Sequence, residues 1–256
     1  MRIRTAATAV CGTLTLVALL APAAQADSHK GDTRFTSVTF SKSTVNVGVS
    51  KAQSVTVVAT AKDDSGISGI WGGKLVGPDQ HIAFPDDASC SRPSSTTMKC
   101  TWKYVFDAND SDDYADLTNG RAGTWHLDAE AAAKDQDFYA LNSSKSVKVK
   151  RYAELAVTQA GPEPVGKGRT LTVTGALTRA NWDTNVYAGY TAQRVALQFK
   201  KSGSSSYSTV KTVTTDSKGK LKTTVKAASS GTWRWVFAGT GTTMAVTAGG
   251  DSVALK

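Results

Sequence analysis

The chain has 256 residues and a formal net charge of +9 at pH 7. That charge is uneven, because residues 27–151 hold 15 Lys and Arg against 16 Asp and Glu, for −1, whereas residues 152–256 hold 13 against 5, for +8. After the N-terminal segment, no apolar run approaches the roughly 20 residues that a membrane-spanning helix needs, which argues against a helical membrane protein.

The N-terminal residues have the pattern of a secretory signal peptide. Met1–Arg4 supplies positive charge, Ala7–Leu20 is apolar, and Ala24–Ala26 offers small residues for cleavage. We therefore predict that residues 1–26 are removed and that the protein is secreted, or associated with the cell wall. The polar residues 27–33 that follow are predicted to be a disordered stub.

Cleavage would remove Cys11 and leave two cysteines, Cys90 and Cys100, in an oxidising compartment. We predict that they form a local disulfide. A redox-active or metal-binding pair is the alternative, but the spacing is not Cys-x-x-Cys and no histidine pattern accompanies it.

Residues 34–151 read as a series of short strands. Alternating apolar residues mark Ser54–Ala61, a strand around Trp102–Phe106, and a long strand that begins at Gly123-Thr124-Trp125. The segment Glu130–Lys134 favours helix by intrinsic propensity. We nevertheless predict strand there, because the alternation that starts at Trp125 continues through it.

Residues 152–256 repeat this order. A second Gly-Thr-Trp strand begins at Gly231, and the pair Val47-Gly48 recurs as Val165-Gly166. We expect Tyr207–Thr215 to pair with Lys220–Lys226 across a tight turn. About seven short strands in each unit predict an all-β protein made of two tandem antiparallel β-sandwiches, at residues 34–151 and 152–256.

Five segments of the second unit have a distinctive sequence: Tyr187–Tyr190, Val195–Lys201, Tyr207–Val213, Gly231–Arg234 and Ala248–Val253. Together they resemble the immunoglobulin-like (Ig-like) repeat of secreted proteins from high-GC Gram-positive bacteria. The first unit is similar more loosely, through Asp63–Ile67 and Gly123–Trp125. The resemblance implies an Ig-like fold and an extracellular location, and some such modules are labelled calcium-binding. It implies no catalytic residue.

Two acidic turns are candidates for a metal site. Asp63 and Asp64 follow one strand, and Asp135 and Asp137 follow the Gly-Thr-Trp strand. In this topology both turns emerge at the same end of the sandwich, where the four carboxylates could bind calcium weakly. The alternative is a set of solvated turn residues, since Asp tolerates turn backbones well. The acidic loop at residues 107–119 is a further, weaker calcium candidate.

The basic second unit is a candidate for binding a polyanion. Lys220, Lys222 and Lys226 share one strand face, and Lys211 is expected nearby. For a secreted protein, the expected partner is an anionic wall polymer, a polysaccharide or a secreted protein rather than nucleic acid. The alternative is an ordinary solvated face whose lysines prevent edge-to-edge aggregation.

The remaining side chains favour a binding protein over an enzyme. Trp182 and its neighbouring tyrosines are expected to cap a core, and Trp71 is a candidate for an exposed aromatic platform. No serine, cysteine or histidine arrangement of a catalytic site is evident. We therefore predict a non-catalytic binding or envelope-associated protein. A calcium-binding structural module and an inhibitor of a secreted enzyme are the alternatives.

Overall fold

The structure is a computed structural model that describes residues 26–109 and 117–256. The signal peptide predicted at residues 1–26 therefore lies outside the described residues except for Ala26, as does the centre of the acidic loop. Strands dominate the described part, and the helices it contains are the single turns η1 (Pro78–Gln80) and η2 (Asn119–Arg121). No helix among the described residues has the length and apolar character required to cross a membrane.

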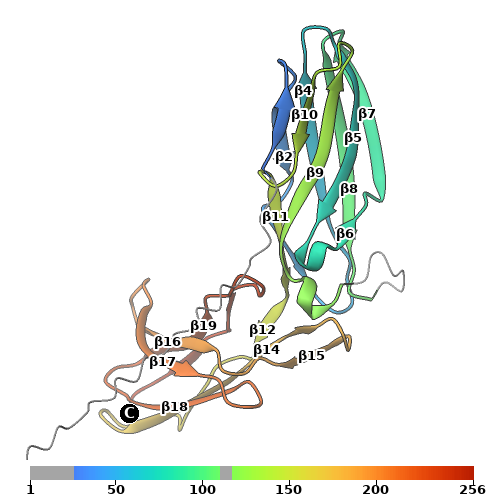
Figure 1. Cartoon of the computed structure of the whole chain (residues 1–256). Coiled ribbons are helices and arrows are strands. Elements are labelled where there is room, and N and C mark those ends of the chain that lie inside the picture. Colours follow the sequence, from blue (N-terminus) through green and yellow to red (C-terminus); the bar gives the residue numbers. More distant parts are fainter. Residues whose placement is uncertain (1–25, 110–116) are drawn as a thin grey trace, which may run out of the picture.

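The N-terminal unit consists of two sheets that pack on one another (Figure 1). The first sheet has the order β1-β10-β9-β11-β3, with β5 paired to β9 and β6 paired to β5, and its strands are β1 (Ser28–Lys30), β3 (Thr44–Val47), β5 (Ile67–Val76), β6 (Ile82–Ala83), β9 (Gly123–Ala133), β10 (Phe138–Leu141) and β11 (Ser146–Arg151). The second sheet has the order β2-β4-β8-β7, and its strands are β2 (Arg34–Phe40), β4 (Gln53–Lys62), β7 (Asp87–Ser94) and β8 (Thr97–Phe106).

The C-terminal unit also consists of two sheets. One has the order β12-β14-β13, with β15 and β18 both paired to β14, and its strands are β12 (Ala153–Leu155), β13 (Gln159–Gly161), β14 (Thr170–Asn181), β15 (Val186–Gly189) and β18 (Lys220–Lys226). The other has the order β17-β16-β19-β20, with β21 paired to β19, and its strands are β16 (Arg194–Lys201), β17 (Ser208–Thr214), β19 (Gly231–Phe237), β20 (Val246–Thr247) and β21 (Asp251–Val253). The all-β fold class is confirmed.

Side-chain alternation explains why these segments are strands. Every second residue of β9 from Trp125 to Ala131 is buried in the core, and the same holds for β4 from Val55 to Ala61. The helix-favouring alanines of β9 are thus held in a strand by burial of one face. The disulfide Cys90–Cys100 is confirmed, and it joins the exposed edge strand β7 to β8.

The duplication seen in the sequence is confirmed in the strand pairing. Gly123 at the start of β9 pairs with Val149, and Gly231 at the start of β19 pairs with Val253. The valine of each Val-Gly pair forms a parallel pairing with a residue near the C-terminal end of its own unit. Val47 pairs with Arg151, and Val165 pairs with Leu255. The two units are therefore variations of one pattern.

Two predictions about local pairing are wrong. Residues 27–33 are not a disordered stub, because Ser28–Lys30 forms β1 and pairs with β10, where His29 stacks on Tyr139. The expected hairpin of Tyr207–Thr215 with Lys220–Lys226 does not form either. After the turn at Asp216–Gly219 the chain crosses to the other sheet, so that β17 pairs with β16 and β18 pairs with β14.

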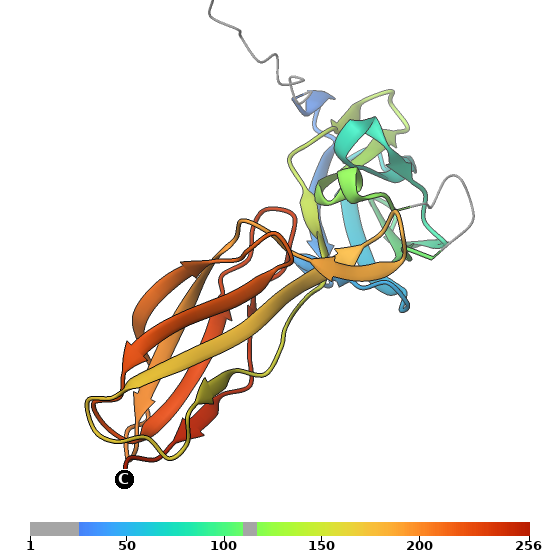
Figure 2. The ribbon, with the colours of Figure 1, turned by 90° about the horizontal axis from the view of Figure 1, so that it is seen from below.

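The junction between the units is made by a hairpin of the second unit. Strand β14 is long enough to pair with β18 at one end and β15 at the other, and Figure 2 shows it reaching from the second unit to the first. Trp182, in the turn of the β14–β15 hairpin, is 2% exposed and belongs to the core of the first unit, as does Ala180. The indole Nε1 donates to the carbonyl of Val47 at 3.2 Å.

Polar contacts hold the same hairpin in place. Asn119 donates from its backbone N–H to Asp183 at 2.8 Å and from its side chain to Asn181 at 2.7 Å. Arg151 is buried beneath the junction, where its Nε donates to the carbonyl of Ala180 at 2.6 Å. Burial, and then the charge of Arg179, lowers the pKa of Arg151 to about 10, so its guanidinium stays protonated at neutral pH.

Candidate functional site

The exposed face of β18 carries a row of lysines. Lys220, Lys222 and Lys226 are exposed, whereas Leu221 and Thr223 between them are buried. We call these three lysines the lysine column. Lys220 and Lys222 are two residues apart and Lys222 and Lys226 are four apart, with Thr224 between them. These separations correspond to about 7 Å and about 13 Å along a strand, so the column presents positive charge along one line.

A row of threonines on β14 lies beside the lysine column. Thr170 pairs with Lys226 and Thr174 pairs with Lys222, so these side chains share the outer face of the sheet. Lys226 Nζ donates to Thr170 Oγ1 at 3.1 Å, which confirms that the two side chains meet on that face. Ammonium and hydroxyl donors therefore line the same surface.

Among the described residues, no carboxylate forms an ion pair with the lysine column. Within residues 26–109 and 117–256 the ion pairs are Lys30–Asp137 and Lys74–Asp128, and both lie in the N-terminal unit. Asp216, the acidic residue nearest the column in sequence, accepts hydrogen bonds from the backbone N–H groups of Lys218 and Lys220. Those backbone hydrogen bonds, followed by the charges of the same lysines, lower the pKa of Asp216.

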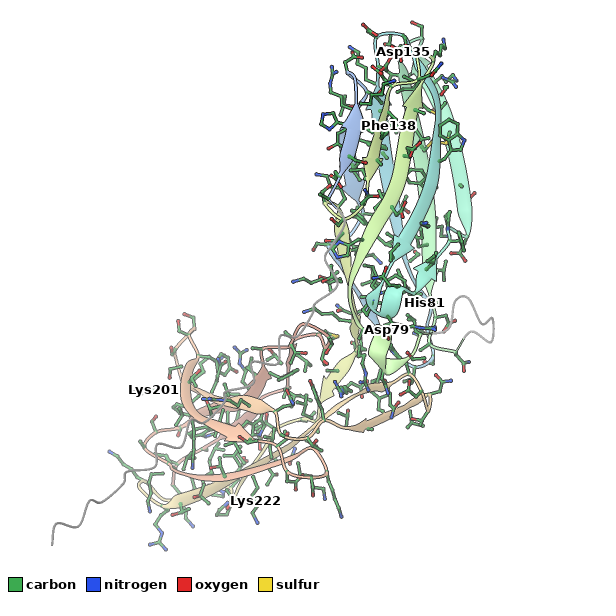
Figure 3. All side chains as sticks on the ribbon, in the orientation of Figure 1. Asp79, His81, Asp135, Phe138, Lys201 and Lys222 are labelled. Carbon is green, nitrogen blue, oxygen red and sulfur yellow. A yellow bond between two sulfur atoms is a disulfide. The ribbon has the colours of Figure 1, made fainter. Side chains whose placement is uncertain are left out.

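Lys211 does not join the column. It lies on β17, in the opposite sheet, because the predicted hairpin between β17 and β18 is absent. That other sheet carries a separate aromatic and basic group, in which the Arg234 guanidinium lies 3.6 Å from the ring centre of Tyr207. In Figure 3, Lys222 of the column and Lys201 of the opposite sheet lie on separate sides of the C-terminal unit.

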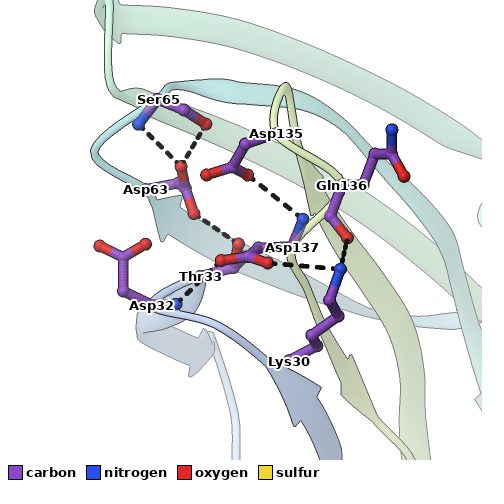
Figure 4. A network of polar contacts seen from close by, with 8 residues as sticks. All are labelled: Lys30, Asp32, Thr33, Asp63, Ser65, Asp135, Gln136 and Asp137. Carbon is purple, nitrogen blue, oxygen red and sulfur yellow. Dashed lines mark hydrogen bonds and ion pairs between the residues drawn. The ribbon is translucent and has the colours of Figure 1, made fainter.

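The four predicted metal-site aspartates, Asp63, Asp64, Asp135 and Asp137, lie at one end of the first sandwich. Figure 4 shows three of them, Asp63, Asp135 and Asp137. Single carboxylate oxygens of Asp63, Asp135 and Asp137 lie within 4.8 Å of one another, and the same is true of Asp32, Asp63 and Asp64. Sequence reasoning missed Asp32, because it falls in the segment that was expected to be disordered. Its place in the turn between β1 and β2 could have been found only by recognising β1.

Local hydrogen bonds already engage the central aspartate of this cluster. Asp63 is fully buried and accepts hydrogen bonds from Thr33 Oγ1 and Ser65 Oγ, each at 2.6 Å. Burial raises the pKa of Asp63, but the hydrogen bonds from Ser65 and Thr33 outweigh it and the net pKa is lowered. Partial desolvation and then the charges of Asp63 and Asp64 raise the pKa of Asp32. The cluster therefore combines the Asp63 carboxylate, which hydrogen bonds stabilise, with the Asp32 carboxylate, which neighbouring negative charges repel.

These directions predict how stability depends on acid. Because its folded pKa lies below the ordinary value of 3.8, Asp63 contributes stability that is present above about pH 4 and is lost as the pH falls through its folded pKa. Asp63→Asn should destabilise the protein at neutral pH by about 1–3 kcal/mol. It should also reduce the fall in the free energy of unfolding as the pH drops below about 4. Urea unfolding between pH 2 and pH 7 measures both effects. The exposed Asp64→Asn is the matched control, and equal losses in the two variants would contradict this role of Asp63.

Of the two aromatic candidates, Trp182 is buried and Trp71 is exposed. Trp182 caps a core, as predicted, although the core is that of the other unit. Trp71 is 53% exposed and its indole lies against Gly69, where a Cβ atom would come within 2.4 Å of the ring. One ring face is thus covered by the strand.

The fold is that of an all-β protein of two sandwiches. No protein-family model and no curated protein sequence matches the chain. Among solved structures, it is similar to the "D0-D1 domain of Intimin" at 16% identity and a TM-score of 0.28, over 86% of this chain and 98% of that one. The "D00-D0 domain of Intimin" is 11% identical with a TM-score of 0.27, over 85% of this chain and 98% of that one. The "Human OSCAR ligand-binding domain" is 12% identical with a TM-score of 0.22, over 86% of this chain and 94% of that one. Likenesses this weak carry no functional argument.

Proposed function

We propose that the protein is a secreted, non-catalytic binding protein whose basic C-terminal unit binds a linear anionic polymer outside the cell. The observation that carries this proposal is the lysine column, three exposed ammonium groups on one strand face, none of which forms an ion pair with a carboxylate in the described part of the chain. The signal-peptide pattern and the disulfide support an extracellular location. The resemblance to secreted Ig-like proteins of high-GC Gram-positive bacteria agrees with an envelope polymer as the partner.

The geometry favours a polymer over a compact anion. A straight β-strand arranges the lysines in a line, and the adjacent threonines can donate hydrogen bonds to the same chain of anionic groups. Because the column is exposed, its attraction acts through water and weakens as salt screens it. The other role open to the lysines is to keep the edge strand β18 from pairing with another molecule.

Charge reversal separates these two roles. We expect the variant Lys220→Glu, Lys222→Glu, Lys226→Glu to lose salt-sensitive retention on immobilised polyphosphate and on purified envelope polymer. The control reverses Arg194, Lys201 and Lys211, which are exposed on the opposite sheet and change the net charge equally. If retention falls equally in both variants, binding depends on net charge alone and not on the lysine column. If neither variant changes retention, the proposal is overturned.

A calcium-stabilised structural module is the second candidate, favoured by two groups of aspartates that share Asp63 at one end of the first sandwich: Asp63 with Asp135 and Asp137, and Asp63 with Asp32 and Asp64. Carboxylate oxygens are the ligands that calcium prefers, and a ligand of the folded state raises its melting temperature. On this proposal, millimolar calcium raises the Tm and a chelator reverses the rise. Asp135→Asn should abolish the shift, and a Tm that calcium leaves unchanged would exclude the site.

A further inference from the structure

The lysine column ends at an open cavity of about 820 Å³ at the far end of the C-terminal unit. Lys226 belongs to both features, since it is the last lysine of the column and lines the cavity. The rest of the wall comes from the turn between β13 and β14 and from Lys256, next to which the turn lies in Figure 2. Three separate parts of the chain therefore converge here.

The charged side chains that line the cavity are all positive. Its charged side chains are those of Arg169, Lys226 and Lys256, and no Asp or Glu side chain is among the lining residues. Glu163, between the two prolines of the turn, is exposed and does not contribute to the wall. In the part of the chain that the structure describes, no ion pair engages any of the three cations.

Backbone contacts fix the positions from which these side chains project. The N–H of Ala227, next to Lys226, donates to the carbonyl of Arg169 at 3.0 Å. The N–H of Lys256 donates to the carbonyl of Val165, also at 3.0 Å. Lys226 is held further by its hydrogen bond to Thr170. Backbone hydrogen bonds thus tie the turn that forms most of the wall to the end of β18 and to Lys256.

We propose that this cavity binds a terminal phosphate group of the polymer that the lysine column contacts. The inference rests on the proposed function and adds to it an end-specific subsite. A phosphomonoester carries a charge of about −1.5 to −2 at pH 7 and three acceptor oxygens. Arginine offers a planar fork of N–H donors to two such oxygens, and each lysine adds a point charge.

The same chemistry disfavours an internal phosphodiester or a carboxylate in the cavity. Each of those groups carries a single charge, which would leave most of the positive charge of Arg169, Lys226 and Lys256 unmatched. An internal phosphodiester suits the column instead, where each lysine presents a single positive charge along the strand. The structure therefore assigns the repeating groups to the column and the doubly charged end to the cavity.

The experiment uses the mature full chain and two probes, inorganic phosphate and a polyphosphate chain with or without its terminal phosphates capped as esters. Binding is followed by NMR shifts of the Arg169 and Lys226 amides and by calorimetry. We expect Arg169→Gln and Lys256→Gln each to weaken phosphate binding about tenfold, while Lys167→Gln, exposed in the same turn but absent from the cavity wall, does not. Capping should abolish the part of polymer binding that depends on Arg169.

The outcomes separate the subsite from the proposed function. If uncapped and capped polymer bind equally and Arg169→Gln changes neither, the cavity is not an end site, even when the column variant loses the polymer. If phosphate binds through Arg169 but the polymer is not retained, the proposed function fails and the subsite binds only a small anion. Equal Tm values of the variants and the wild type show that folding is intact.

Discussion

Replacing Trp182 with alanine should lower the free energy of unfolding of the N-terminal unit by about 3–5 kcal/mol, although Trp182 lies in the C-terminal half of the chain. The indole is 2% exposed within the first core, and its Nε1 donates to Val47. Truncation leaves a cavity and removes one of the two hydrogen bonds that the Val47 carbonyl accepts, the other coming from the backbone N–H of Tyr152. Urea unfolding followed through tryptophan fluorescence and NMR amide signals of each unit measures the loss.

The matched control for this variant is Trp71→Ala, the same chemical change at a residue that is 53% exposed. It should cost clearly less stability than Trp182→Ala, because about half of the Trp71 side chain is already exposed to solvent. A Trp182 variant as stable as the Trp71 variant would show that the hairpin does not complete the first core.

Separating the two units at the predicted boundary between residues 151 and 152 should affect them unequally. The second core consists of residues from Ala153 to Val253, so the fragment 152–256 keeps all of it. The fragment 27–151 loses Ala180 and Trp182 from its core, together with the hydrogen bonds that Asn119 makes to the hairpin. We expect the fragment 152–256 to unfold cooperatively. The fragment 27–151 should lose at least as much stability as the Trp182 variant, about 3–5 kcal/mol.

Chemical unfolding of both fragments and of the full chain tests this expectation. Dye binding to exposed apolar surface provides a second readout, since an open core should bind such a dye. If residues 27–151 unfold at the same urea concentration alone and in the full chain, the boundary separates two independent domains and the hairpin contributes no stability.

Most of the fold prediction came from two sequence patterns, the alternation of apolar and polar residues and the repetition of short motifs. The alternation in β4, β8 and β9 predicted the core-facing residues, because a strand with one buried face must repeat every second residue. The recurrence of Gly-Thr-Trp and Val-Gly predicted two related units, and both motifs occupy matching positions in the strand pairing. These features are local and therefore readable from the sequence.

Features that depend on the partner strand were not readable. The turn at Asp216–Gly219 has the residues of a hairpin turn, yet the strands on either side join different sheets, which separates Lys211 from the lysine column. Trp182 was correctly expected to cap a core, but nothing local shows that the core is that of the other unit. Asp32 was overlooked because a three-residue strand such as β1 forms only through its pairing with β10.

The most direct test of the proposed function is the salt dependence of polyphosphate binding. Each lysine that releases a counterion from the polymer contributes roughly one unit to the slope of log affinity against log salt concentration. Replacing Lys220, Lys222 and Lys226 together with glutamine should therefore reduce that slope by about three, while glutamine at Arg194, Lys201 and Lys211 leaves it nearly unchanged. A slope that is the same in the wild type and both variants would contradict binding through the lysine column.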